Sequence, residues 1–450
     1  MAMQPVMLID VVGLTAGLLE HAPNLRRLAE AGGMTELRPV FPAVTTTVQA
    51  SMVTGVGPGR TAETTPDGKG WHGIVGNGWY DRERCEVRFW ERSNHLVQAE
   101  QVWETAKQRD ASFTCANLFW WYNSYSACDY VVQARPIYKA DGRKIPDCYT
   151  SPNALRDELQ GKLGRFPLFK FWGPLAGIES TRWIVDAACE VLREKRPTLT
   201  LVYLPHLDYG LQQWGPGDER VPAAVSAVDA EAGRLLALTE ELGVRPIVVS
   251  EYGIETVDGD GAGGAIAINR VLREAGLLAV REEDGLEVLD PGASRAFAVA
   301  DHQVAHVYHE AGLELPKIAH CSRVSLDHPR AGDTVLMADA GRWFTYDYWL
   351  DDRVAPDFAR TVDIHRKPGY DPRELFSSVN KAGVAWKLMK RKLGMRQLLD
   401  VVPLDTSLVR GTHGRVGDDV TERPVMLGVG SGETQPCTSV RDVVLEAVFS

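Results

Sequence analysis

Three short apolar runs, far apart in the chain, each contain or precede an acidic residue. The runs are Pro5–Val12, Leu199–Leu204 and Arg245–Ser250, and the acids are Asp10, Asp208 and Glu251. Their residue types predict strands buried on both faces, as in a largely parallel sheet. Ligand sites of open α/β sheets lie at the carboxyl ends of the strands, so the three acids are expected at one edge. There they suit a hard divalent cation, although three unrelated strand-end caps would give the same pattern.

A cluster of hydroxyls, Thr45, Thr46 and Thr47, stands between an extended segment and a predicted helix over Val48–Val53. The first turn of a helix has unpaired backbone N–H groups and the positive end of the helix dipole. An anion binds well there, and so does a nucleophile that must lose a proton. A threonine at this place also serves as an N-cap, so the local pattern alone leaves both interpretations open.

Strands and helices alternate over the whole chain, which predicts an open α/β sheet flanked by helices. Further strands are predicted over residues 35–39, 298–308, 334–337 and 424–429, and helices over residues 180–195, 225–242, 264–276 and 387–396. We expect one domain, residues 1–450, with cap insertions at about 85–175 and 265–395. The last helix, Lys387–Arg396, is basic, and a solvated face explains it better than a binding patch.

The chain has 450 residues and a formal net charge of −11, so a broad nucleic-acid surface is not expected. Its seven cysteines are scattered and never spaced C-x-x-C, which favours free thiols in a reducing compartment, and we expect the cytoplasm. No apolar run approaches the roughly 20 residues that a membrane span needs. The expected partners are small molecules, with neither nucleic acid nor membrane, and the sequence predicts no oligomeric state.

Two aromatic clusters, Trp79-Tyr80 and Phe119–Tyr122, have two explanations each. They are either core and lid packing or a face on which a substrate ring stacks. The polar stretch Arg60–Trp71, rich in Gly, Pro and Thr, predicts a surface loop.

Several short motifs together resemble the type I phosphodiesterase/nucleotide pyrophosphatase branch of the alkaline phosphatase superfamily. They are the first strand with Asp10, Thr45 through Thr54-Gly55, His72-Gly-Ile through Asn77 to Tyr80-Asp81, and Gly411-Thr-His-Gly. The resemblance is spread over most of the chain. It implies a single alkaline-phosphatase-like α/β domain with a cap insertion, two divalent metal ions, usually zinc, and a threonine nucleophile that forms a covalent phospho-enzyme.

Residue by residue, the resemblance assigns the nucleophile to Thr45, nine residues before Thr54-Gly55, with Thr47 as its competitor. The matching metal ligands are Asp10, Thr45, Asp208 and His413. The amides of Gln49 or Asn77 are the expected hydrogen-bond donors to the phosphoryl oxygens of a substrate.

Three expected metal positions depart from the family pattern. Gln212 stands where the family has a histidine, and Glu251-Tyr252 stands where it has Asp-His. Oxygen groups at these positions favour a harder metal, manganese or magnesium, unless another histidine fills in. His365, which shares one face of an extended segment with Asp363, is the first candidate for that role. The other candidates are His206 and His302.

The resemblance implies a metal-dependent hydrolase of phosphodiester or nucleotide pyrophosphate bonds that acts through a phospho-threonine. A phosphomonoesterase, or a phosphonate hydrolase that cuts a C–P bond, is the alternative on the same scaffold. Because of the changed ligands, a non-catalytic, metabolite-binding descendant is a third reading. No arginine is close to Thr45 in sequence, which favours a singly charged diester over a monoester, although Arg410 and Arg415 flank His413.

Overall fold

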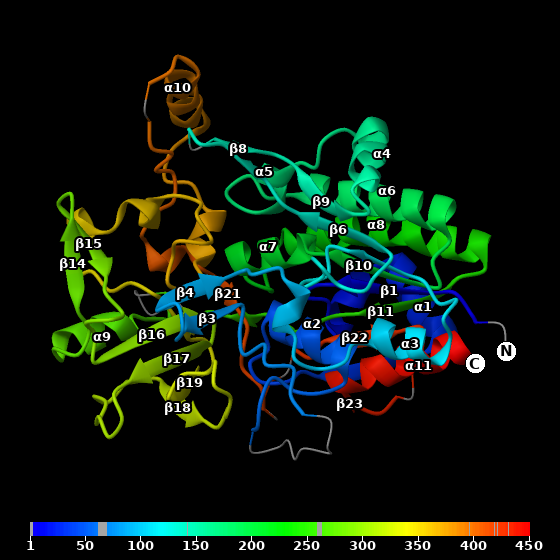
Figure 1. Ribbon diagram of the computed structural model, residues 1–450, viewed down its shortest axis with the longest axis horizontal. Helices are drawn as coiled ribbons and strands as arrows, with labels where there is room; N and C mark the ends of the chain where they lie inside the picture. Colours follow the sequence, from blue (N-terminus) through cyan, green and yellow to red (C-terminus); the bar gives the residue numbers. More distant parts are fainter. Residues whose placement is uncertain are drawn as a thin grey trace.

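The computed structural model describes residues 3–61, 70–141, 143–258, 263–395, 397–417, 419, 420, 422–430 and 432–450. Within them the largest sheet has nine strands, in the spatial order β23, β2, β22, β11, β1, β10, β5, β6, β9. Their bounds in chain order are β1 Val6–Val11, β2 Met34–Arg38, β5 Cys115–Leu118, β6 Tyr130–Ala134, β9 Cys148–Ser151, β10 Leu199–Leu204, β11 Arg245–Val249, β22 Val425–Leu427 and β23 Gln435–Pro436. Helices cover both faces of this sheet, so the predicted α/β architecture is confirmed (Figure 1).

Side chains that alternate along β1 build two hydrophobic layers. Met7 and Ile9 face one layer, whereas Val6 and Leu8 face the other. The first layer is closed by α1 Pro23–Gly32, α4 Ala154–Leu163, α6 Ile178–Lys195, α7 His206–Trp214 and α8 Val221–Leu242. The second layer is closed by α2 Thr45–Thr54, α3 Val102–Arg109 and α11 Val440–Phe449. The central strand is therefore buried on both faces, as its residue types predict.

The register of β1 brings the acidic positions to one level. β1 pairs in parallel with both β10 and β11, and Asp10 stands opposite Tyr203 on one side and Val249 on the other. Beyond this level the chain continues into Asp208, in the first turn of α7, and into Glu251, two residues after the end of β11. The acids at the three strand ends therefore share one edge of the sheet.

A second, smaller sheet with its own hydrophobic core lies beside the first (Figure 1). Its antiparallel strands are, in spatial order, β16 Ala296–Asp301, β17 Val304–His309, β19 Thr334–Ala338 and β18 Cys321–Val324. The single strand predicted over residues 298–308 is wrong, because the chain turns back at His302 and Gln303 to form the β16–β17 hairpin. His302 has a φ of 56°, a left-handed conformation that hydrophobic periodicity does not reveal.

Other predicted boundaries also need correction. The segment 85–175 is not a cap as a whole, because β5, β6 and β9 are strands of the central sheet. The helix predicted over 264–276 is shorter, with α9 at Ile268–Glu274. The basic helix, α10, begins earlier than predicted and spans Lys381–Lys392. Arg396 and most of the Arg60–Trp71 loop lie outside the described residues.

The remaining strands and short helix are β3 Gly78–Asp81, β4 Glu86–Phe89, β7 Ile137–Tyr138, β8 Lys144–Ile145, α5 Leu168–Phe171, β12 Glu255–Thr256, β13 Ala265–Ile266, β14 Val280–Glu283, β15 Leu286–Leu289, β20 Trp343–Phe344 and β21 Gly411–Thr412. Of the helices in the described ranges, none has the length and apolar character to cross a membrane.

Candidate active site

Thr45 is the first residue of α2, a helix whose residues are all buried. The N-cap position is taken by Val44, and the Thr45 hydroxyl does not cap the helix. Instead, Thr45 Oγ1 lies 2.9 Å from the hydroxyl of Tyr252. The N-cap interpretation of Thr45 is therefore wrong, and its hydroxyl faces the edge where the acids lie.

The neighbouring hydroxyls differ from Thr45 in their partners. Thr46 Oγ1 donates to the backbone oxygen of Gly76 at 2.8 Å, and its backbone N–H donates to Asn77 Oδ1 at 3.1 Å. Asn77 in turn donates through its backbone N and its Nδ2 to the two oxygens of Asp301, at 2.7 and 3.1 Å. The amide of Asn77, expected to contact substrate, is thus committed to holding the start of α2. Thr47 Oγ1 is buried without a hydrogen-bond partner among the described residues.

Asp10 and Glu251 share a single amide donor. Gln49 Nε2 lies 3.1 Å from Asp10 Oδ2 and 2.5 Å from Glu251 Oε1, while Gln49 Oε1 accepts from the backbone N–H of Trp121 at 2.8 Å. Burial raises the pKa of Asp10 to about 7. Burial, and then the charge of Asp10, raises the pKa of Glu251 well above its usual range. Gln49, expected to bind substrate, is therefore a clamp between two buried acids.

Asp208 sits in a separate set of hydrogen bonds. Its Oδ2 accepts from Gln212 Nε2 at 2.8 Å, and its Oδ1 lies 3.5 Å from the Tyr252 hydroxyl. Gln212 Oε1 accepts from the hydroxyl of Tyr370 at 2.8 Å. Burial raises the pKa of Asp208 to about 7, because no full positive charge is among its hydrogen-bond partners within the described residues.

Four aromatic rings stack in a column beside these acids. Tyr252 lies on His413 with ring centroids 3.6 Å apart, His413 on His302 at 3.7 Å, and His302 on Tyr370 at 3.7 Å. His413 Nδ1 is 2.8 Å from the backbone oxygen of Ala43, which assigns its proton to Nδ1 and leaves Nε2 as a lone pair. Burial lowers the pKa of His413 to about 3, so the ring is neutral.

Most of the predicted site residues are thus linked by direct contacts. They are Asp10, Thr45, Gln49, Asp208, Gln212, Glu251, Tyr252 and His413. His365 lies elsewhere, with Nδ1 3.2 Å from the backbone oxygen of Phe89 and near Arg92, and no contact among the described residues links it to the acids. His302, which stacks on His413, has the stronger geometric claim to replace a missing imidazole.

Asp301 and Tyr370 are the site residues that the sequence interpretation missed. Asp301 ends the first strand of a hairpin that was predicted as one strand. Tyr370 lies in a loop far along the chain, just before Asp371 and Pro372.

The aromatic run Phe119–Tyr122 is mostly core. Phe119, Trp120 and Tyr122 are buried in three different hydrophobic clusters. Trp121 packs on Trp90 with centroids 5.0 Å apart and lies next to Gln49. Its backbone N–H donates to the Gln49 side chain, which in turn contacts both Asp10 and Glu251, so Trp121 is one hydrogen-bonded residue away from the acids.

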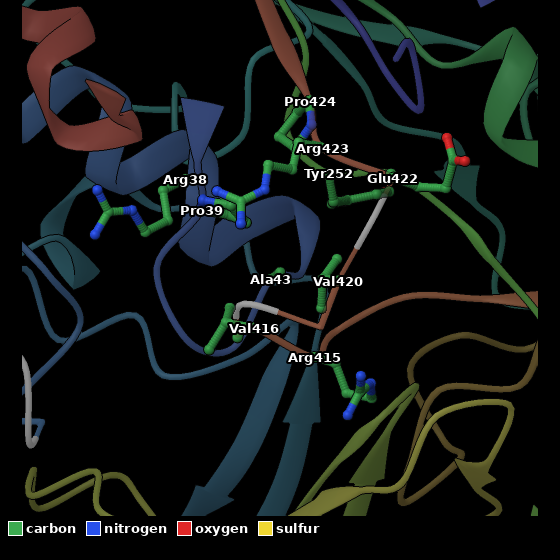
Figure 2. A pocket seen from close by; sticks show the side chains of 12 residues that line it. Arg38, Pro39, Ala43, Tyr252, Arg415, Val416, Val420, Glu422, Arg423 and Pro424 are labelled. Atoms are coloured by element: carbon green, nitrogen blue, oxygen red, sulfur yellow. The ribbon is translucent and has the colours of Figure 1, made fainter. Parts of the chain in front are cut away.

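A small pocket adjoins the site from outside (Figure 2). Ala43 and Tyr252 form part of its wall, together with the arginines Arg38, Arg415 and Arg423. Arg415 is already paired, with Nε 3.2 Å from Glu255 and Nη2 2.6 Å from Asp419.

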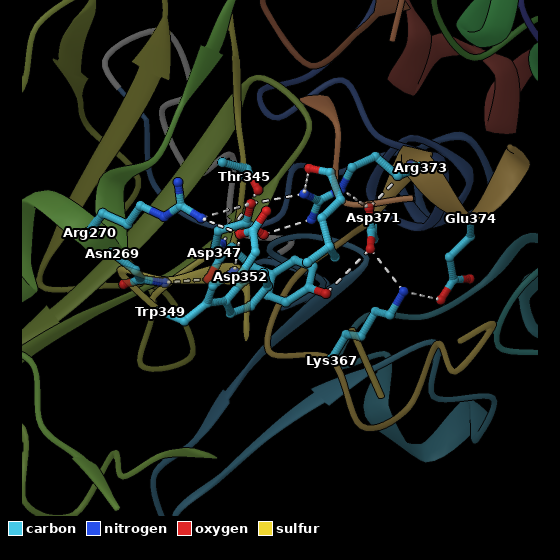
Figure 3. Close-up of polar contacts among 12 residues, drawn as sticks. Asn269, Arg270, Thr345, Asp347, Trp349, Asp352, Lys367, Asp371, Arg373 and Glu374 are labelled. Atoms are coloured by element: carbon cyan, nitrogen blue, oxygen red, sulfur yellow. Dashed lines mark hydrogen bonds and ion pairs between the residues drawn. The ribbon is translucent and has the colours of Figure 1, made fainter. Parts of the chain in front are cut away.

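A buried ionic cluster holds the loop that supplies Tyr370 (Figure 3). Lys367 Nζ lies 2.8 Å from Asp371 and 2.7 Å from Glu374. Arg373, which is fully buried, pairs with Asp347 at 2.6 Å and with Asp371 at 2.8 Å. Isolated ions at this depth would each cost several kcal/mol, so the cluster stands only as a complete set.

The same loop is hydrogen-bonded to Trp172 and to strand β16 of the smaller sheet. Trp172 Nε1 donates to Glu374 at 2.5 Å, and the backbone N–H of Tyr370 donates to the oxygen of Ala300 in β16 at 2.9 Å. Tyr370 also packs its ring near Trp90 and Trp172. The cluster therefore fixes the position from which Tyr370 reaches Gln212.

The solved structures that resemble this fold include the following two. An inactive threonine-to-alanine variant of murine ectonucleotide pyrophosphatase/phosphodiesterase 5, in complex with AMP, aligns over 99% of this chain and 95% of its own, with 14% identity and a TM-score of 0.56. Phosphonoacetate hydrolase from Sinorhizobium meliloti 1021, in complex with phosphonoformate, aligns over 99% of this chain and 96% of its own, with 15% identity and a TM-score of 0.60. No curated protein sequence matches the chain. The fold thus defines the class as alkaline-phosphatase-like.

The sequence model of type I phosphodiesterase / nucleotide pyrophosphatase matches residues 6–371. The protein belongs to this family, which confirms the resemblance predicted from the sequence motifs. The family and its enzyme neighbours support a phosphoric ester hydrolase, and the family is generally dependent on divalent metals.

The residues present offer atoms for such a cation. Asp10 Oδ1, Glu251 Oε2 and His413 Nε2 are buried and lack a hydrogen-bond partner among the described residues, which a bound cation would explain. Across the described ranges, no three His, Cys, Asp or Glu side chains already surround one point. The donor set therefore has to include other oxygens, and the hydroxyls of Thr45 and Tyr252 adjoin the acids.

The first prediction concerns the ionic cluster. Arg373→Met leaves Asp347 and Asp371 buried with fewer partners, so the free energy of unfolding is expected to fall by about 3–5 kcal/mol. Arg353→Met is the matched control, because Arg353 is exposed and pairs at the surface with Asp351. Urea denaturation of both variants measures the difference, and equal midpoints would show that the cluster does not hold the loop.

The second prediction concerns pH in the absence of metal. Asp208 has a folded pKa of about 7 against about 3.8 in the unfolded chain. The folded protein therefore binds the extra proton, and this contribution to stability, complete below about pH 4, is lost as the pH rises through about 7. Asp208→Asn removes the titration, so its melting temperature relative to wild type is expected to improve between about pH 5 and about pH 8 in EDTA. A difference that stays constant, or moves the other way, would contradict a buried carboxyl with a raised pKa.

Proposed function

We propose that this protein hydrolyses phosphodiester or nucleotide pyrophosphate bonds, with Thr45 as nucleophile and a divalent cation at the adjoining acids. The position of Thr45 Oγ1 carries the proposal. It lies at the N-terminus of α2, 2.9 Å from Tyr252 and one helical turn before Gln49, whose amide contacts both Asp10 and Glu251. The family assignment supports it, and the AMP-bound neighbour is inactive as a threonine-to-alanine variant.

The chemistry of the proposal follows from these groups. A divalent cation bound at the acids would lower the pKa of the Thr45 hydroxyl and offset the charge on the phosphoryl oxygens. Thr45 Oγ1 releases its proton to water and attacks phosphorus, the P–O bond to the leaving group breaks with its electron pair on the leaving oxygen, and a phospho-threonine forms. Water then cleaves this ester and restores the hydroxyl. The positive end of the α2 dipole faces the reacting group throughout.

Tyr252 fixes the nucleophile before the reaction. Its hydroxyl joins Thr45 Oγ1 to Asp208, and its ring is held flat against His413. The oxygen-rich surroundings of Thr45 suit manganese or magnesium better than zinc.

The charges around the site favour a diester over a monoester. A monoester brings two negative charges, and phosphatases commonly meet them with a free arginine or a further cation. Here two of the cations near the site are already neutralised, Arg415 by Glu255 and Asp419, and Arg373 by Asp347 and Asp371. A diester brings one negative charge and a second substituent, and Trp121, which packs on Trp90, is the aromatic side chain next to Gln49.

The third prediction tests the nucleophile with two isosteric variants two residues apart. Thr45→Val is expected to lower kcat/KM for bis-p-nitrophenyl phosphate by about a thousandfold or more, because the attacking oxygen is gone. Thr47→Val is the matched control and is expected to keep activity within about threefold, since Thr47 Oγ1 lacks a partner among the described residues. The reverse order would move the nucleophile to Thr47, and full activity in both variants would refute a threonine mechanism.

The fourth prediction concerns substrate class. Wild-type protein supplied with manganese is expected to show a kcat/KM for bis-p-nitrophenyl phosphate at least about tenfold above that for p-nitrophenyl phosphate. Phosphonoacetate serves as the third substrate, assayed by phosphate release. A preference for the monoester would favour a phosphomonoesterase, and turnover of phosphonoacetate alone would favour C–P cleavage. Absence of turnover on all three, with manganese bound, would contradict the proposal.

A further inference from the structure

The candidate site has two halves, one at Asp10 and Glu251 and one at Asp208, which differ in whether their carboxylate oxygens have hydrogen-bond partners. In the half at Asp10 and Glu251, one oxygen of each carboxylate is buried and has no hydrogen-bond partner among the described residues. Thr45 and Gln49 are one turn apart on α2 and share a face, so the Thr45 hydroxyl lies on the side where Gln49 meets both acids. This half therefore offers one open oxygen from each of the two acids, together with the Thr45 hydroxyl, whose contact is the hydroxyl of Tyr252.

The half at Asp208 is closed by hydrogen bonds. Both carboxylate oxygens of Asp208 have donors, Gln212 Nε2 at 2.8 Å and the Tyr252 hydroxyl at 3.5 Å. Tyr370 holds the other end of the Gln212 amide by donating to Oε1 at 2.8 Å. Gln212 thus turns its N–H groups, which cannot ligate a cation, toward Asp208.

His413 Nε2 is the remaining unpartnered atom of the closed half within the described residues. The ring lies between those of Tyr252 and His302, at 3.6 and 3.7 Å. One imidazole does not make a cation site, because protein metal sites use three or four protein ligands.

The closure is built into the packing of the molecule. Tyr370 stacks on His302 and is followed directly by Asp371 of the buried ionic cluster. Freeing the oxygen of Gln212 would therefore require moving Tyr370. This residue is held by the ionic cluster, by the backbone of β16 and by two tryptophans.

We propose that this protein binds one divalent cation, at Asp10, Glu251 and Thr45, and that Gln212 and Tyr370 close the position of a second. The inference rests on the proposed function, because it assigns the cation of the same site. Oxygen ligands of this kind suit manganese or magnesium.

A single cation also narrows the substrate class. In sites with two metals, the second metal stabilises the leaving oxygen. With one cation beside Thr45, the leaving group has to be a weak base on its own, such as a phosphate of a pyrophosphate bond or a phenolate. Alkyl phosphodiesters, which release a strongly basic alkoxide, are then expected to be poor substrates.

The test counts and locates the cation. Full-length protein is stripped with EDTA, dialysed and titrated with MnCl₂ by calorimetry, and bound manganese is examined by electron paramagnetic resonance. Wild type is expected to bind one equivalent with the spectrum of an isolated ion. Asp10→Asn is expected to weaken the manganese Kd by about tenfold or more. The matched variant Asp208→Asn is expected to change it by less than about threefold.

A gain-of-site variant completes the experiment. The double variant Gln212→His, Tyr370→Phe replaces the Gln212 amide by an imidazole and removes the Tyr370 hydroxyl that holds this amide in wild type. It is expected to bind a second equivalent of manganese. Thermal unfolding checks that each variant is folded, and Glu251→Gln replaces Asp10→Asn if the latter is not.

Several outcomes would overturn the inference. They are two equivalents in wild type, a spin-coupled manganese pair, no binding at all, or equal weakening by Asp10→Asn and Asp208→Asn. Hydrolysis is measured separately, so that the two proposals fail separately. Two bound ions, with turnover that requires Thr45, would contradict only the single-cation inference. One bound ion without turnover would contradict the proposed function.

Discussion

Asp10 is the last residue but one of β1, Glu251 stands two residues beyond the neighbouring strand β11, and both share the amide of Gln49 as a donor. The backbone N–H of Trp121 fixes this amide, so Gln49 cannot turn its oxygen toward the acids. One neutral amide does not balance two buried carboxylates, which therefore need a proton or a cation. The raised pKa of Asp10 and that of Glu251 express the same requirement. The surrounding scaffold thus holds two buried acids that lack a balancing positive charge among the described residues, and the proposed cation would supply it.

The central part of the fold could be predicted from the sequence, because parallel strands buried on both faces leave a continuous apolar run. The run over residues 199–204 matches β10, and β1 and β11 lie within one residue of their predicted ends. The strands β5, β6 and β9 were missed because each has four or five residues and lies among loops and aromatics. Their place in the sheet is decided by pairing with distant strands, which local pattern does not contain. The β16–β17 hairpin was missed because its turn carries His302 and Gln303, without the Gly or Asn that usually marks such a turn.

The site was predictable to the extent that it follows from strand ends and motifs. The ends of the predicted strands give Asp10, Asp208 and Glu251, and the spacing of the family motif gives Thr45. The roles of Gln49 and Asn77 were not predictable, because each amide is captured by a partner from another part of the chain, Glu251 in one case and Asp301 in the other. Tyr370 reaches the site only because the ionic cluster folds its loop inward.

The replacements at Gln212 and Tyr252 act together rather than one by one. A neutral imidazole at either position could offer a nitrogen lone pair to a cation, whereas the amide nitrogen of Gln212 and the phenol of Tyr252 donate hydrogen bonds here. Both donate to Asp208, so each oxygen of this carboxylate has a partner, although burial still raises its pKa to about 7. Tyr252 also reaches Thr45, which makes the same phenol a link between the closed half and the nucleophile. The two side chains therefore occupy the oxygens of Asp208, whereas Asp10 and Glu251 each keep one oxygen without a partner among the described residues, and the threonine keeps its position at the start of α2.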